Sequence, residues 1–159
     1  MRGLVLAIAV VLAGCGGSKA ESVREAELGE YAKLVPKRGA YVRLLNAEGE
    51  RWRAVFDADW DVIEIKGVWQ TKDGEWSTMR IAPERTQKLW ALAAEVLAHP
   101  QAPFTHQPDL RLELAIADGD DKAVLIKTQG PFVDGPAKQL FEGIKGWVPD
   151  PGDSANQAH

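Results

Sequence analysis

The chain is poor in cysteine, with one residue, Cys15, among 159. A single thiol cannot form a disulfide within the chain, so no covalent cross-link can stabilise the fold in an oxidising compartment. Stability must therefore come from an apolar core. The chain is long enough to bury one such core and too short for two.

Long apolar runs are also absent. The longest apolar run, from Gly3 to Ala13, has about eleven residues and would give roughly 16 Å of helix. A bilayer core is about 30 Å thick, so this run cannot span it alone. Its length is typical of the hydrophobic region of a signal peptide, and Arg2 precedes it as a minimal positive segment. We therefore predict an export signal.

The chain has no excess of basic charge. The chain has 19 Lys and Arg residues and 23 Asp and Glu residues, which gives a net charge of −4. Nucleic-acid-binding domains carry a basic footprint that complements phosphates. We therefore expect no nucleic-acid partner, and no basic surface for anionic lipid headgroups.

The cysteine stands where the apolar run ends. Leu12, Ala13, Gly14 and Cys15 together resemble the lipobox of bacterial lipoproteins. The resemblance implies that a diacylglyceryl group is attached to the Cys15 thiol, that signal peptidase cuts before it, and that fatty acids such as palmitate anchor the protein to a membrane. Gly16, rather than Asp, follows the cysteine. In enteric-type bacteria this implies the outer membrane, with the protein facing the periplasm or the cell surface of the envelope.

Four segments are predicted. Residues 1–14 form the lipoprotein signal peptide, and residues 15–39 form a lipid-anchored linker. A short helix starting at Ser22 and a mobile stalk are both compatible with this linker. Residues 40–148 form one domain, and residues 149–159 are predicted to be a disordered tail because they lack an apolar pattern.

Within the domain, apolar residues alternate with polar ones in several extended runs. Turn residues separate these runs into three hairpins, and the clearest strand has Leu110, Leu112, Leu114 and Ile116 on one face. The predicted strands are residues 41–45, 51–56, 61–71, 75–81, 110–117 and 122–128. This pattern predicts an antiparallel sheet of about five to six strands.

Two stretches have helical spacing instead. Pro83 stands at a first helical position, and apolar residues follow at intervals of three and four until His99 and Pro100 end the pattern. A shorter stretch, 137–148, places Leu140 and Ile144 on one side. We therefore predict an α+β domain with two helices packed on one face of the sheet.

The order of these elements resembles that of small extracytoplasmic domains related to emfourin, a bacterial inhibitor of thermolysin-like metalloproteases. The resemblance covers roughly residues 50–148 and includes the strand that ends in MRIAPE, the following helix, the proline-rich loop, the DLRLELAIADG hairpin and the short final helix. It implies a compact module that binds a protein and is not catalytic. No inhibitory residue is carried over.

Six tryptophans is a high number for this length. Those on an exposed face of the sheet would stack on sugar rings, whereas the alternative is that they pack in the interior. Trp60, Trp69 and Trp76, with Asp59, are the candidate ligand-binding residues. We expect a glycan or small-ligand site only where they are exposed.

Other chemistry finds little support in the sequence. The acidic stretch 57–61 begins like a calcium loop but has Val62 and Val68 where glycine and glutamate are needed. His99 and His106 lack the spacing of zinc ligands. No serine has a nucleophile motif. We therefore predict no metal, no cofactor and no catalytic residue, and a hydrolase would need a cleft that gathers one of these histidines with carboxylates.

The sequence thus predicts a non-catalytic, lipid-anchored binding module of the bacterial cell envelope. An envelope or extracellular protein is the first expected partner, with protease inhibition as the activity that the emfourin resemblance implies. A glycan or small ligand held by exposed tryptophans is the alternative.

Overall fold

A computed structural model of the chain describes residues 20–68 and 76–149. The predicted signal peptide and lipobox, the turn at residues 72–74, Trp69 and residues 150–159 of the predicted tail lie outside the described residues. In chain order the elements are α1 (Val23–Leu28), the 3-10 helix η1 (Gly29–Lys33), β1 (Arg38–Asn46), β2 (Gly49–Asp57), β3 (Val62–Gly67), β4 (Ser77–Arg80), α2 (Pro83–Ala98), β5 (Arg111–Asp118), β6 (Lys122–Thr128) and α3 (Pro136–Lys145).

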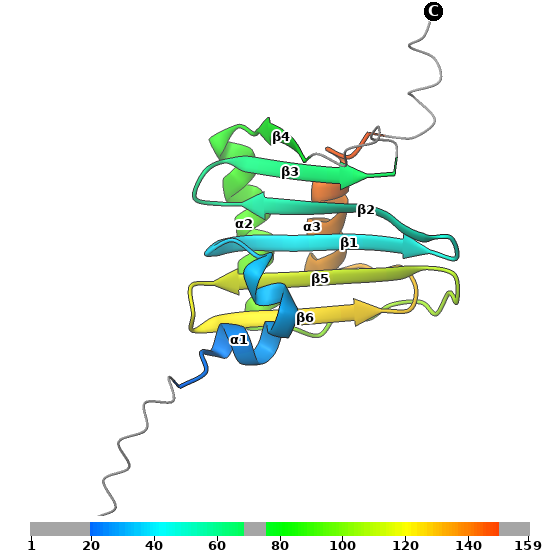
Figure 1. Ribbon diagram of the computed structural model, residues 1–159, viewed down its shortest axis with the longest axis horizontal. Coiled ribbons are helices and arrows are strands. Elements are labelled where there is room, and N and C mark those ends of the chain that lie inside the picture. The colour runs from blue at the N-terminus through cyan, green and yellow to red at the C-terminus, as the bar shows by residue number, and fades with distance from the viewer. Residues whose placement is uncertain (1–19, 69–75, 150–159) are drawn as a thin grey trace, which may run out of the picture.

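The described strands form one antiparallel sheet of six strands in the order β4-β3-β2-β1-β5-β6 (Figure 1). The first four strands form a meander, and β5 then pairs with the free side of β1. The predicted α+β class and antiparallel sheet are confirmed. The long-range pairing of β1 with β5 places β1 in the interior of the sheet, between β2 and β5.

One face of the sheet, called the inner face below, packs against α2 and α3. Successive side chains of a strand point to opposite faces, and Ala54, Phe56, Ile63 and Ile65 of the inner face are at most 1% exposed. They belong to the same apolar cluster as Leu89, Ala93 and Val96 of α2 and Leu140, Phe141 and Ile144 of α3. This cluster is the main core.

The opposite, outer face carries the third helix. Leu28, Tyr31 and Val35 from α1, η1 and the chain after them form a second cluster with Tyr41, Ala115 and Ala117. In Figure 1, α1 lies in front of β6, while α2 and α3 lie behind the sheet. The two helices predicted for the domain, α2 and α3, both contribute to the inner-face core. The short helical segment before β1 instead buries an apolar stripe of its own on the outer face.

The N-terminal segment is attached by local capping and by one arginine. The Ser22 hydroxyl accepts a hydrogen bond from the Glu25 N–H (3.2 Å), and the Glu25 carboxylate accepts one from the Ser22 N–H (3.3 Å), which forms a capping box. The Arg24 guanidinium donates to the carbonyl oxygens of Ala32 (2.9 Å) and Pro36 (3.0 Å). These bonds hold η1 and the following turn against α1, and the Arg24 N–H donates to the Asp120 carbonyl (3.1 Å), which ties α1 to the turn between β5 and β6.

Candidate functional site

The outer face of the sheet is covered over only part of its width. Helices α1 and η1 lie over the side formed by β5 and β6, whereas no helix of the described residues lies over the outer face of β2, β3 and β4 (Figure 1). Strand alternation places Val55, Asp57, Val62 and Glu64 on this open part. We call it the open half-face.

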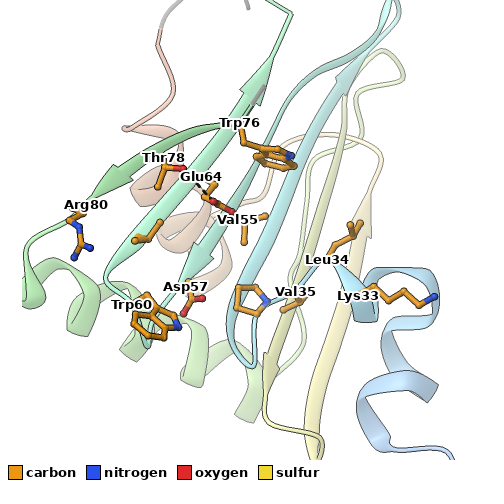
Figure 2. A pocket seen from close by; sticks show the side chains of 12 residues that line it. Lys33, Leu34, Val35, Val55, Asp57, Trp60, Glu64, Trp76, Thr78 and Arg80 are labelled. Carbon is orange, nitrogen blue, oxygen red and sulfur yellow. Dashed lines mark hydrogen bonds between the residues drawn. The ribbon is translucent and has the colours of Figure 1, made fainter. Parts of the chain in front are cut away.

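A groove of about 620 Å³ crosses the open half-face, within the range typical of ligand pockets. Its floor comes from β2, β3 and β4, and one wall comes from the end of η1 and the turn after it, residues 33–36. The wall and the floor are distant in sequence, so the groove exists only once η1 has docked. In Figure 2 the indoles of Trp60 and Trp76 lie at opposite ends, with Val55 and Glu64 between them.

Trp60 is held by the turn that joins β2 to β3. Within this turn the Asp57 carboxylate accepts a hydrogen bond from the Asp59 N–H (3.0 Å), and Asp61 has a positive φ of 53°, a conformation that aspartate tolerates. The Ile81 N–H donates to the Asp61 carbonyl (2.9 Å), which ties the turn to the chain after β4. The turn leaves the Trp60 side chain 73% exposed.

Trp76 directly precedes β4 and is 37% exposed. Thr78, two residues later, lies opposite Glu64 in the register of β4 and β3. The Thr78 hydroxyl donates a hydrogen bond to the Glu64 carboxylate (3.3 Å). This bond orients a hydroxyl and a carboxylate side by side on the groove floor, where Figure 2 shows them between the two indoles.

The charges that line the groove are balanced. Asp57 and Glu64 are acidic, and Lys33 and Arg80 are basic. Figure 2 shows Arg80 and Lys33 on opposite sides of the groove. Neither forms an ion pair with another described residue. The groove therefore offers hydrogen-bond donors and acceptors without a strong field of one sign.

The structure brings two of the predicted ligand-binding residues together. Trp60 and Trp76 line the same groove. Asp59 does not line it, because its carboxylate forms an ion pair with Arg38 (3.2 Å). Trp69 lies outside the described residues. The prediction of exposed tryptophans thus has a structural counterpart at two positions, and Asp57 takes the place expected for Asp59.

The remaining described tryptophans belong to the interior. Trp52 is buried in the main core and contacts Phe141, with ring centroids 5.5 Å apart. Trp90 and Trp147 are partly buried against the same core. Interior packing, the alternative considered for all the tryptophans, therefore applies to these three.

Four polar residues that line the groove were not predicted from the sequence: Asp57, Glu64, Thr78 and Arg80. Their alternation along β2, β3 and β4 could have shown that they share one face of the sheet, since every second residue of a strand lies on the same face. The wall at residues 33–36 could not be predicted from neighbouring residues in the sequence, because its place in the groove depends on the docking of η1.

A polar network occupies the outer face beside the covered part. The Tyr31 hydroxyl donates to the Glu113 carboxylate (2.6 Å), and Arg43 forms ion pairs with Glu113 (3.4 Å) and with Glu50. Arg53 also pairs with Glu50 (2.6 Å). Burial, and then the hydrogen bond and charge of Glu113, raise the pKa of Tyr31 to about 12. The network joins η1 to three strands, and its groups bond to each other.

No metal-ligand cluster is formed by residues 20–68 and 76–149. No three His, Cys, Asp or Glu side chains in these ranges gather as metal ligands. His99 and His106 are exposed, and neither lines the groove. The cleft that the hydrolase alternative requires is therefore not provided by this groove.

Comparisons with known proteins identify no family. No protein-family model matches the chain, and no curated protein is significantly similar to it. Among the helices of the described ranges, none has the length and apolar character needed to cross a bilayer. What the chain binds must therefore be argued from the groove.

Proposed function

We propose that the protein is a lipid-anchored, non-catalytic binding module of the bacterial cell envelope, and that the groove on the open half-face is its ligand-binding surface. The observation that carries this proposal is the placement of two exposed indoles, Trp60 and Trp76, at the ends of one groove. Exposed aromatic side chains that share a concave surface are typical of ligand sites.

The anchoring part of the proposal rests on the lipobox-like residues Leu12 to Cys15. Seven residues separate Cys15 from Val23, the first residue of α1. Even fully extended, this segment spans no more than roughly 30 Å. An anchored domain would therefore work close to the membrane, and we place it at the outer membrane, facing the periplasm or the cell surface.

Fractionation of the native host tests the anchor. The unaltered chain is expected in the membrane fraction, and a Cys15→Ser chain is expected to lose its acyl chains and leave that fraction, because a short apolar segment alone holds a protein weakly. Mass spectrometry of the N-terminal peptide supplies the direct readout. An unmodified thiol in the native chain would contradict the proposal.

Site-specific photo-crosslinking in the native host tests the groove. A photoreactive amino acid in place of Trp60 is expected to form a defined adduct, whereas the same group in place of Phe104 is not. Phe104 is a fair control because it is also exposed, at 43%, and does not line the groove. Equal labelling at both positions, or none at position 60, would count against the groove as the binding surface.

The resemblance to emfourin favours a protein partner as the second candidate, with inhibition of a thermolysin-like protease as its activity. Residual protease activity in the presence of the full chain is the measurement. Full activity at a large excess of the chain would remove this candidate and would leave the groove proposal intact.

A further inference from the structure

We propose that the ligand of the groove is a saccharide chain, an inference that rests on the proposed function and names its ligand class. Three features of the open half-face support this choice: the paired state of its backbone, the placement of its two indoles, and the mixture of polar groups between them. The first and third features select against other kinds of ligand, and the second favours a ligand that repeats a flat unit.

The backbone beneath most of the groove is already paired within the sheet, and of the three floor strands only β4 lies at an edge. Strand β3 lies between β2 and β4 and pairs with both, and β2 lies between β1 and β3. A peptide that binds by adding a strand needs an unpaired edge, and the floor of the groove over β2 and β3 offers none. A ligand that lies over β2 and β3 must therefore be held there by side chains and not by strand addition.

The indoles present flat apolar surfaces at two separated points. An aromatic face carries partial negative charge, and the C–H bonds on one side of a sugar ring carry partial positive charge, so the two surfaces attract when they stack. Trp60 and Trp76 lie at opposite ends of the groove with Val55 between them (Figure 2). Two separate platforms suit a ligand that repeats a flat unit along its length.

The polar groups between the platforms include both donors and acceptors. Asp57 and Glu64 accept hydrogen bonds, and Arg80 and Lys33 donate them. The Thr78 hydroxyl gives its proton to Glu64 and keeps lone pairs that accept. Sugar hydroxyls both donate and accept, so they match a mixed set. A polyanion such as a nucleic acid would meet two carboxylates on the groove floor, and a long apolar chain would leave these charged groups without partners.

The experiment uses the full chain in lipid nanodiscs and an array of four saccharides: the N-acetylglucosamine tetramer, cellotetraose, maltotetraose and lipopolysaccharide core oligosaccharide. Binding to at least one of them is expected. The Trp60→Ala and Trp76→Ala variants should each weaken it about tenfold or more, as truncation of a central aromatic contact does. Phe104→Ala removes an exposed aromatic group outside the groove and should leave the affinity unchanged.

Two further variants report on the polar groups. Glu64→Gln keeps the shape of the side chain but weakens its acceptor strength, and Thr78→Val removes the hydroxyl donor that contacts it. Each should weaken saccharide binding severalfold. Circular dichroism of every variant shows whether the fold is retained, and the exposure of Trp60 makes its replacement the safest for the fold.

The outcomes separate this inference from the proposed function. If no saccharide binds but a crosslinker at position 60 captures a protein, the saccharide inference is wrong and the groove is still a binding surface. If saccharides bind equally to the Trp60→Ala, Trp76→Ala and unaltered chains, the inference is also wrong. If neither a saccharide nor a crosslinked partner depends on position 60, both proposals fall.

Discussion

The two faces of the sheet differ in how they are covered. The inner face packs against two helices, α2 and α3, and its residues on β2 and β3 are almost completely buried. The outer face is covered by α1 and η1 over β5 and β6, and it is open over β2, β3 and β4 (Figure 1). The comparison teaches that one face provides the stability of the fold while the other has room for a ligand.

The cause lies in the lengths of the covering segments. Helix α2 has 16 residues and α3 has 10, whereas α1 has six and η1 has five. A six-residue helix is less than two turns long and covers only part of a six-stranded sheet. Adjacent positions of β2 show the consequence, since Phe56 is fully buried in the core while Val55 is half-buried and lines the groove.

The largest difference in stability between the two faces should appear when Phe56 and its neighbour Val55 are each replaced by alanine. Phe56→Ala leaves a cavity in the main core and should lower the free energy of unfolding by about 3–5 kcal/mol. Val55→Ala removes two methyl groups from a half-buried site and should cost about 1 kcal/mol or less. Urea denaturation of both variants gives the comparison, and equal losses would show that the outer face contributes as much as the inner one.

A smaller loss of stability is expected when the contacts that hold the N-terminal segment in place are removed. Arg24→Ala removes the guanidinium that bonds to the carbonyls of Ala32 and Pro36 and should destabilise the fold by about 2 kcal/mol. It should also speed hydrogen exchange in residues 29–36, which include the groove wall. Arg51→Ala is the control, because its ion pair with the exposed Glu48 is expected to contribute little. Unchanged exchange in this segment would contradict the role of Arg24.

The covered part of the outer face should respond to pH through Tyr31. At pH 8, Tyr31→Phe removes the hydrogen bond to Glu113 and should cost about 1 kcal/mol. The folded protein holds the pKa of Tyr31 at about 12, against an ordinary value of 10.0. The unfolded chain therefore ionises first, and the unaltered protein loses stability as the pH rises from 10 toward 12.

The Phe variant has no phenol at position 31 and escapes this loss. The difference in free energy of unfolding between the unaltered protein and the Phe variant should therefore shrink above pH 10, as measured by denaturation of both proteins at matched pH values. Tyr41 titrates in both proteins and cancels in the comparison. A deficit that stays constant up to pH 12 would contradict the raised pKa.

The smallest effect on stability is expected at the open half-face. Trp60 is largely exposed, so Trp60→Ala should change the free energy of unfolding by no more than about 0.5 kcal/mol while it weakens ligand binding. A loss of several kcal/mol would show that the indole supports the fold, and the binding loss would then have a structural cause.

Local signals in the sequence predicted the elements well. The alternation of Leu110, Leu112, Leu114 and Ile116 predicted β5, Pro83 marked the start of α2, and Ser22 with Glu25 formed the expected capping box. These features depend on neighbours within a few residues, which the sequence displays directly.

Features that depend on distant contacts were not predictable in this way. The pairing of β1 with β5 joins segments about 70 residues apart, and the place of η1 on the outer face follows from the burial of Leu28 and Tyr31 against that pair. The groove depends on the same arrangement, because the end of η1 and the turn after it form one of its walls. The position of Asp59 outside the groove was not predictable either, since its ion pair with Arg38 requires the register of β1 and β2.

The most direct test of this account is hydroxyl-radical footprinting of the full chain, once in native envelopes and once in ligand-free nanodiscs. We expect Trp60 and Trp76 to be oxidised readily in nanodiscs and protected in envelopes, where the ligand is present, while Phe104 is oxidised equally in both. Equal oxidation of the two tryptophans in both settings would contradict the claim that the open half-face is a binding surface.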